Sequence, residues 1–381
     1  LIEASVRQCA LILSGTWTVS GLDIQHYQDG FWPREQAVSI SGDRVVVENC
    51  RVTHSEFVGL IVSGQDGIIR GNEIAYNGLM GFTSCYGHRM TFQGNRVHHN
   101  AWHGDVKCGT CGNKWVAWRD SAFIGNHFHD EPASALWLDI SDANILIAEN
   151  LFEDCDVGVY FEISRYAIIV NNVFKRCCRG IWIYSSDALV AHNVVDSCGE
   201  GITISSYPRS TAVFPEKGEP SRPDALMAVR NNLIVNNILV DCPGAYVGIM
   251  EPDAYGWGNA SDYNVIGWTL PAVHETGLHI NFMSSWDRLY GKLPIWRMER
   301  HCDEHSTLAD APLLAAVREG SPWVGVPESQ IVDSIGFVDR AAGDYRLRPD
   351  SKLTGRGIRI PAELNAPYTP GPGHRLASRL F

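Results

Sequence analysis

The chain has 381 residues, of which 45% are hydrophobic and 19% are charged, so it is long enough to bury a large core. Its formal net charge of −12 argues against nucleic acids and membrane surfaces as partners, because anionic surfaces repel an acidic protein. The sequence contains no apolar stretch of about 18 residues, so neither a membrane-spanning helix nor an intact signal peptide is expected.

A motif of the form Asn-x-apolar recurs along the chain, with intervals of 23, 23, 31, 24, 22, 21 and 39 residues. It begins at Asn49, Asn72, Asn95, Asn126, Asn150, Asn172, Asn193 and Asn232. Five positions later comes a second column of small polar residues, which includes His54, Asn77, Asn100, Cys155, Cys177 and Cys198. The last clear coil repeats this spacing with Asn237 and Cys242. This period is typical of a right-handed parallel β-helix, and the cysteine column predicts stacked thiols rather than a disulfide framework.

Each coil also carries a short strand that usually opens with Gly or Ala. These strands are predicted at residues 37–41, 59–63, 81–85, 103–107, 135–139, 158–162, 180–184 and 201–205. Alternation along a strand directs its second and fourth residues inward and its third and fifth residues outward. The inward residues are almost all apolar, so they form a continuous core.

We therefore predict one all-β domain, a β-helix over residues 1–355 followed by a Pro-rich tail at 356–381. Insertions are expected at about 108–115, 206–225 and 267–330. Within the last of these, residues 284–302 suggest a short helix that is interrupted before Pro294. Residues 336–353 return to a strand-turn-strand pattern.

The outward positions of the four middle coils gather charged and aromatic residues on one open face. These residues are Asp105, Lys107, Trp137, Asp139, Tyr160, Glu162, Trp182 and Tyr184. Successive aromatic rings on an outward face favour carbohydrate binding, because sugars stack their C–H faces on such rings and large exposed apolar patches usually have a partner.

Asp139 and Glu162 occupy the same outward position one coil apart. Neighbouring strands lie about 4.7–4.9 Å apart, so the two carboxyl groups are expected roughly 5 Å from each other. Retaining glycosidases need about 5–5.5 Å, whereas inverting enzymes need roughly 6.5–9.5 Å. Lys107 beside Asp139 would keep that group ionised, which suits a nucleophile, and Glu162 suits the general acid/base. The alternative is that both are solvated charges on an outer sheet face.

Other polar residues near this face are assigned more loosely. Asp105 is either an acceptor for substrate hydroxyls or the partner of Lys107, and Trp102 and His103 form part of the pocket wall. A lone C-x-x-C at 108–111 predicts a disulfide or plain loop residues rather than a metal site. The histidines of the chain's two dense clusters are expected on turns, and neither a metal nor a cofactor is predicted. These histidines are His98, His99, His127 and His129.

Three short segments resemble the β-helix glycoside hydrolases of family 120, the β-xylosidases. They are D-V-K at 105–107, W-L-D at 137–139 and F-E at 161–162. The resemblance is close over residues 100–190. It implies a retaining mechanism with Asp139 as nucleophile, Glu162 as acid/base and Lys107 as a further site residue. A fucosidase-type β-helix family is an equally reasonable neighbour for sugar specificity.

Two other functions compete with a glycosidase that acts on plant or algal oligosaccharides or polysaccharides. A polysaccharide lyase or uronate epimerase needs Ca²⁺ or Lys and Arg side chains around a uronate carboxylate, and here Arg165 and Arg179 could join Lys107. A non-catalytic carbohydrate-binding β-helix would keep the aromatic residues without needing paired carboxylates. The oligomeric state is open, with a homo-oligomer as one alternative, and an extracellular or periplasmic location is favoured over a cytoplasmic one.

Overall fold

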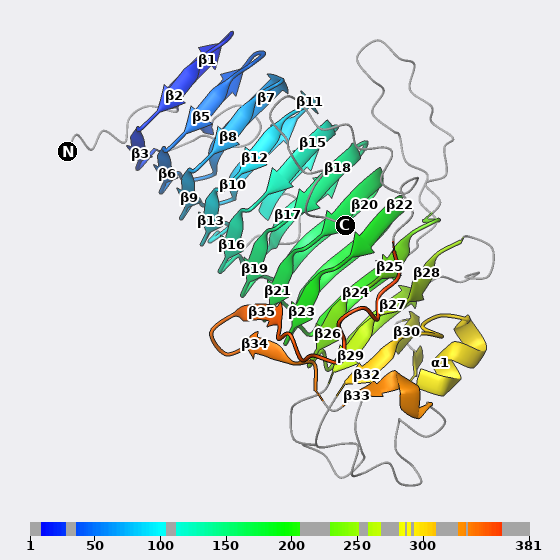
Figure 1. The fold of residues 1–381 in the computed structure, drawn as a ribbon. Coiled ribbons are helices and arrows are strands. Elements are labelled where there is room, and N and C mark those ends of the chain that lie inside the picture. Colours follow the sequence, from blue (N-terminus) through cyan, green and yellow to red (C-terminus); the bar gives the residue numbers. More distant parts are fainter. Residues whose placement is uncertain are drawn as a thin grey trace.

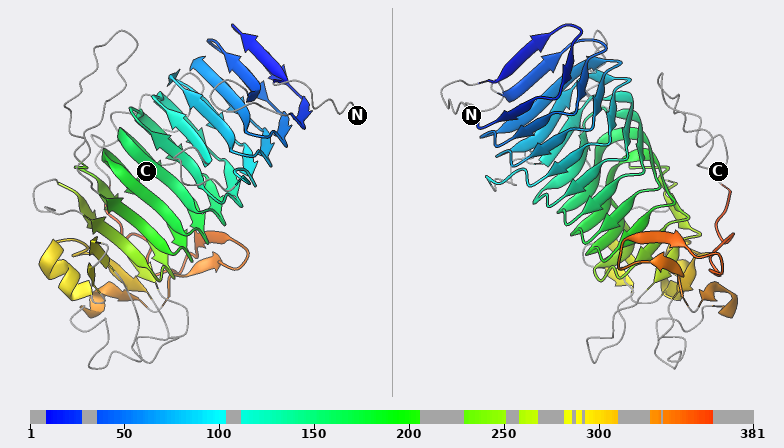
Figure 2. Two further views of the ribbon diagram at one scale, coloured as in Figure 1. Left: turned by 180° about the vertical axis from the view of Figure 1, so that it is seen from behind. Right: turned by 60° about the vertical axis from the view of Figure 1, so that its left-hand side comes forward.

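The computed structural model describes residues 9–27, 36–103, 112–205, 229–250, 258–267, 282–285, 288–290, 293–309, 327–332 and 334–359. These residues wind into a right-handed parallel β-helix whose coils stack along one axis (Figure 1). Strands of successive coils lie side by side in parallel, as two further views show (Figure 2). The fold class predicted from the sequence is confirmed. No helix in this part of the chain is long and apolar enough to cross a membrane.

The first side of the β-helix consists of the strands that the sequence pattern places at the start of each coil. They are β1 (Leu11–Ser14), β4 (Gln36–Ser41), β7 (Val58–Gln65), β10 (Met80–Cys85), β14 (Gly112–Val116), β17 (Ser134–Asp139), β20 (Val157–Val170), β22 (Arg179–Ala191), β24 (Glu200–Ser205), β27 (Ala245–Met250) and β30 (Phe282–Ser285). β20 and β22 are long because they continue around a corner onto the second side.

The second side is made of shorter strands that follow the first side in each coil. They are β2 (Thr18–Ser20), β5 (Val46–Glu48), β8 (Ile68–Arg70), β11 (Gly87–His88), β12 (Thr91–Gln93), β15 (Arg119–Ile124), β18 (Ala143–Ala148), β25 (Leu233–Val235) and β28 (Ala260–Asp262). They belong to the same continuous sheet as the first side.

The third side is a separate parallel sheet of 12 strands, most of them three residues long. They are β3 (Asp23–Gln25), β6 (Arg51–Thr53), β9 (Glu73–Ala75), β13 (Arg96–His98), β16 (His127–His129), β19 (Leu151–Glu153), β21 (Val173–Lys175), β23 (Val194–Asp196), β26 (Ile238–Val240), β29 (Val265–Gly267), β32 (Thr307–Ala309) and β33 (Ile331–Val332). Every coil therefore closes a triangle around the same interior.

The interior is filled by apolar side chains stacked coil upon coil, as the alternation predicts. Ile40 and Leu60, two predicted inward residues, are completely buried. On the third side the ring of Phe152 stacks on Phe128 and on Phe174, with centroids 5.1 and 4.8 Å apart. Burying each such side chain stabilises the fold by about 1.5–3 kcal/mol, so the stack itself is the main source of stability.

An asparagine ladder runs along one corner of the β-helix. The amide oxygen of Asn150, for example, accepts hydrogen bonds from the backbone and side-chain N–H groups of Asn126, both at 2.9 Å. The Asn-x-apolar motif thus marks a ladder of buried amides that satisfy one another. The hydrogen bonds of this ladder correct two predicted members. In the first coil the ladder position is Cys50 rather than Asn49, and after Asn193 the next member is Asn237 rather than Asn232. Asn232 belongs to another ladder, in which it bonds Asn259.

The second polar column is also a buried ladder, five positions after the first. Its members are Ser55, Asn77, Asn100, Glu131, Cys155, Cys177, Cys198 and Cys242. Ser55 replaces the predicted His54, whose φ of 58° places it on the preceding turn. The four cysteines of this column are free thiols, as stacking predicts, while Cys108 and Cys111 lie outside the described residues.

The fourth coil differs from its predicted register. The strand that pairs with β10 on one side and β17 on the other is β14, not the predicted segment 103–107. Its Lys114 aligns with Thr83 and Trp137, and its Trp115 is completely buried. The extra residues of this coil therefore precede the first-side strand, and part of the predicted insertion 108–115 is a strand of the core.

The C-terminal part of the structure covers the end and one flank of the stack. β31 (Arg288–Tyr290) leads into helix α1 (Leu293–Arg300), which has Pro294 inside its first turn, where a proline is tolerated, rather than after an interruption. Trp296 of α1 is completely buried in the main core. A 3₁₀ helix occupies Glu328–Gln330. The predicted strand-turn-strand is the antiparallel hairpin of β34 (Phe337–Asp339) and β35 (Asp344–Leu347), beside the third side (Figure 1).

Candidate active site

Asp139 and Glu162 end up side by side on the outward face of the first side. Asp139 is the last residue of β17, and its Cα partner in β20 is Glu162, which is paired in turn with Tyr184 of β22. The one-coil separation therefore corresponds to one strand spacing, about 4.8 Å. Asp139 is 5% exposed and Glu162 is 4% exposed, so the pair is more enclosed than an open sheet face.

Among the described residues, the lysine that contacts the nucleophile candidate is Lys114. Its Nζ lies 2.6 Å from Oδ2 of Asp139. Lys114 belongs to β14, in the strand position that the sequence pattern had assigned to Asp105. Lys107 and Asp105 themselves lie outside the described residues. The segment G-N-K-W-V at 112–116 carries the sequence signal for this strand, because it opens with glycine and its side chains alternate between inward and outward positions.

Trp137 and Tyr160 occupy the outward position two residues before the carboxylates, and their rings stack on one another. The ring of Tyr160 lies between Trp137 and Trp182, with centroid distances of 5.4 and 4.5 Å. Lys114 Nζ lies 3.9 Å from the Trp137 centroid, and the Arg179 guanidinium lies 3.9 Å from the Trp182 centroid. The stacking and the two cations therefore cover faces of the Trp137, Tyr160 and Trp182 rings. The alternation of residues along the strand predicts only that these rings point outward.

The stacked rings of Trp137, Tyr160 and Trp182 also contact Glu162, through Trp137. Nε1–H of Trp137 donates a hydrogen bond to Oε2 of Glu162 at 3.1 Å. Tyr184 packs edge-on against Tyr160 and Trp182, at 6.1 and 5.1 Å between centroids, and is 6% exposed. The aromatic residues therefore help to fix the position of Glu162.

Asp142 is a further acid near the pair, and the sequence analysis did not identify it. It is completely buried, and its Oδ1 accepts a hydrogen bond from the backbone N–H of Trp118 at 2.6 Å. Burial raises the pKa of Asp142 well above its usual range, and the charge of Asp139 adds to the rise. Its sequence signal is weak, because it follows the strand by three residues and belongs to a turn.

The residue after each carboxylate has an unfavourable backbone conformation. Ile140 has φ of 63° and Ile163 has φ of 49°, a left-handed region that β-branched residues rarely enter. A hydrogen bond of 3.2 Å from the Ile140 N–H to the Glu162 carbonyl helps to hold the two turns in register. Each such residue costs about 1–2 kcal/mol, and strain of this kind is concentrated at functional sites.

Trp102 and His103 lie in a different place from the carboxylate pair. Their rings stack on each other at 4.2 Å, and Nε1–H of Trp102 donates to the Tyr76 carbonyl at 3.0 Å. Trp102 lines a pocket of about 700 Å³ on the third side, together with His99 and Asp130. Within the described residues, the lining of this pocket includes Trp102 but neither catalytic candidate, and Nε2 of His103 lies 2.8 Å from the Glu56 carbonyl oxygen.

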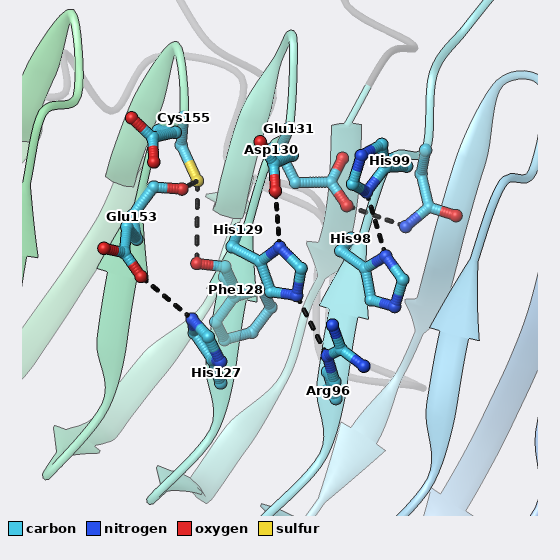
Figure 3. A network of polar contacts seen from close by, with 12 residues as sticks. Arg96, His98, His99, His127, Phe128, His129, Asp130, Glu131, Glu153 and Cys155 are labelled. Carbon is cyan, nitrogen blue, oxygen red and sulfur yellow. Dashed lines mark hydrogen bonds and ion pairs between the residues drawn. The ribbon is translucent and has the colours of Figure 1, made fainter.

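The histidines predicted to lie on turns are partly in strands. His98 ends β13, and His127 and His129 are the first and last residues of β16, whereas only His99 has the left-handed conformation of a turn, with φ of 54°. Figure 3 shows these side chains gathered on the outward face of the third side. This location separates them from the carboxylate pair, which lies on the first side.

The coils and their ladders define a protein of the right-handed parallel β-helix class. The family model for the right handed beta helix region matches residues 10–130 and 116–214, and the chain belongs to this family. A search of curated proteins finds no sequence match.

Solved structures with a similar fold show low identity. The A-module of the mannuronan C-5 epimerase AlgE4 from Azotobacter vinelandii has a TM-score of 0.39 and 11% identity, covering 72% of this chain and 77% of that one. The Dettilon tailspike protein has a TM-score of 0.40 and 13% identity, covering 69% and 60%. A DFA-IIIase from Arthrobacter chlorophenolicus A6 has a TM-score of 0.36 and 12% identity, also covering 69% and 60%. These similarities concern the fold alone.

Proposed function

We propose that this protein is a retaining glycoside hydrolase acting on xylose-containing or related plant or algal oligosaccharides. The observation that carries the proposal is the register of β17 and β20, which makes Asp139 and Glu162 neighbours across one strand spacing. That spacing, about 4.8 Å, is close to the separation of about 5–5.5 Å that double displacement requires and too small for an intervening water. The likeness of the W-L-D and F-E segments to β-xylosidases supports the choice of sugar.

The two carboxylates receive different roles from their different partners. Asp139 pairs with the Lys114 ammonium at 2.6 Å, which stabilises the carboxylate anion that a nucleophile requires. Trp137 orients Glu162 through the hydrogen bond from its Nε1–H to Oε2, which holds the carboxyl group beside Asp139 for proton transfer. In the first step Glu162 gives its proton to the glycosidic oxygen while Asp139 bonds the anomeric carbon. In the second step Glu162 takes a proton from water as water displaces Asp139.

The contacts of the cations argue against a lyase or an epimerase. Lys114 is engaged with Asp139, and Arg179 is engaged with Glu200 at 2.7 Å. A uronate carboxylate would have to compete with both of these acids for its neutralising charges. If the carboxylates have only a structural role, the outcome is different. Replacing Asp139 or Glu162 by its amide then changes the stability of the protein and leaves its turnover unchanged.

The test is a panel of aryl glycosides, including aryl xylosides, assayed with the wild-type protein and with Asp139→Asn and Glu162→Gln. We expect Asp139→Asn to reduce kcat by about 10³-fold or more, and Glu162→Gln to reduce it most for substrates with poor leaving groups. Matched controls are Asp187→Asn and Glu149→Gln, both at positions with φ near 60°, which should keep full activity. Circular dichroism and thermal melting establish that each variant is folded.

The stereochemistry is read by NMR of the first product anomer. Retention of configuration supports double displacement between Asp139 and Glu162. Inversion overturns the retaining mechanism, and full activity in a folded Asp139→Asn variant overturns the assignment of the site. A wild-type protein without turnover on any glycoside that still binds oligosaccharides supports the non-catalytic alternative.

A further inference from the structure

A cluster of three histidines on the third side is separate from the proposed active site. His98 and His129 are Cα partners at the ends of β13 and β16, and His99 follows on the turn (Figure 3). One potential ligand atom from each of the three side chains lies within 4.8 Å of the others. In the part of the chain that the structure describes, this is the one group of three or more such side chains brought so close together.

The hydrogen bonds of His98 leave one of its ring nitrogens directed at His99. Nε2 of His98 lies 3.2 Å from Oε1 of Glu73, and Nδ1 of His98 lies 2.9 Å from Nδ1 of His99. We assign the Nε2 proton to the contact with Glu73, since a carboxylate accepts and does not donate. A histidine that donates one N–H to a carboxylate and offers its other nitrogen is the usual arrangement of a metal ligand.

His129, in the neighbouring coil, also has a carboxylate beside one of its ring nitrogens. Its ring stacks on His98 with a centroid distance of 4.4 Å, its Nδ1 lies 2.6 Å from Oδ2 of Asp130, and Nε of Arg96 donates to its Nε2 at 3.0 Å. An ion at His129 replaces one of these two contacts. The Arg96 side chain is 57% exposed and lies 3.9 Å from Glu73, so it can turn toward that acid instead.

The cluster is reachable from solvent and lies among acids. His99 and Asp130 line the pocket of about 700 Å³, through which an ion or a chelator can approach. The carboxylates of Glu73 and Asp130 supply negative charge beside the imidazoles.

We propose that His98, His99 and His129 bind one divalent transition-metal ion, of which Zn²⁺ is the representative probe. Imidazole nitrogen suits Zn²⁺, Co²⁺, Ni²⁺ and Cu²⁺ and does not suit Ca²⁺ or Mg²⁺, which prefer oxygen. Zn–N distances of about 2.0–2.1 Å require the three rings to approach each other slightly on binding. Asp130 or a water from the pocket completes four-coordination. The ion links two neighbouring coils and does not depend on the proposed hydrolase site.

The test uses untagged protein stripped with a chelator and titrated calorimetrically with Zn²⁺, together with the visible absorption of bound Co²⁺. We expect one ion per chain and a higher melting temperature in its presence. His99→Asn, which retains a residue suited to a positive φ, should weaken binding at least 100-fold, and Asp130→Asn should weaken it by about 10–100-fold. The matched control is His305→Ala, because His305 is an exposed histidine paired with Asp262.

The outcomes separate the proposal from adventitious binding. Absence of saturable one-to-one binding of Zn²⁺ and Co²⁺ by the wild-type protein overturns it. Equal affinity in the wild-type protein and a folded His99→Asn variant overturns it as well, because the ion would then sit elsewhere. Loss of binding in His305→Ala with binding kept in His99→Asn would move the site to the other histidine and refute the assignment.

Discussion

Glu131 is the one acid in the ladder of amides and thiols, and its replacement by glutamine tests the reasoning about buried charge most directly. The side chain is completely buried, and its Oε1 accepts a hydrogen bond of 2.7 Å from Nδ2 of Asn100. Burial raises the pKa of Glu131 from 4.5 to about 8, although hydrogen bonds from Asn100 and Asn113 oppose the rise. The folded protein therefore keeps this proton at neutral pH.

The sign of the pH dependence follows from comparing the two states. Below pH 4.5 the folded and unfolded chains both carry the proton, so the group has its full stabilising effect there. Between pH 4.5 and about 8 the unfolded chain has released the proton and the folded chain has not, so the free energy of unfolding falls as pH rises. With these pKa values the fall between pH 5 and pH 8 is about 3.5 kcal/mol.

Glutamine cannot ionise, so Glu131→Gln should remove this fall. Denaturant unfolding of both proteins at pH 5, 6, 7 and 8 measures the difference, and subtracting the two curves cancels the remaining titratable groups. The control is Glu149→Gln, an exposed turn residue that should leave the slope unchanged. Parallel curves for the wild-type protein and Glu131→Gln would refute a neutral Glu131, and so would a variant that is less stable than wild type at pH 8.

Three further predictions concern the carboxylate pair. Lys114→Met should lower kcat and reduce stability by about 3 kcal/mol, because the buried charge of Asp139 would lose its ion pair with Lys114. A melting temperature equal to that of the wild-type protein within experimental error would contradict this prediction. Trp137→Phe keeps the ring stack but removes the hydrogen bond to Glu162, so a shifted pH–rate profile with a stability loss of only about 1 kcal/mol is expected. Ile140→Asn should raise stability by about 1 kcal/mol, because asparagine tolerates φ of 63°, whereas Ile140→Val should not.

The periodic part of the molecule was predictable because its signals repeat. Asn126 and Asn150 mark the ladder, and the alternating strands around Leu136 and Val159 give the register that pairs Asp139 with Glu162. The predicted register of one coil supports that of the next, because shifting a strand by one residue would turn its apolar side chains outward.

The fourth coil was mispredicted because periodicity fails where a coil is long. The sequence D-V-K and the sequence G-N-K-W-V both fit the strand template, and only the pairing with β10 and β17 decides for β14. The stacking of the aromatic rings on one another was not predictable for another reason. Alternation gives the direction of a side chain such as Tyr160, but it does not show that rings from successive coils cover one another.

Several departures from the repeat lie in the fourth coil, and they relate the two proposed sites. The coil that brings Lys114 to Asp139 on the first side is the coil that carries His129 and Glu131 on the third side. Regular coils satisfy many of their polar groups with asparagine and thiol ladders, although later coils also bury acids, such as Asp196 and Asp241, which both pair with Arg340. A neutral Glu131, a lysine on a buried carboxylate and three facing histidines all cost stability locally, and a large apolar stack on both sides can offset that cost. The coil of Lys114 and His129 therefore contributes to both proposed sites.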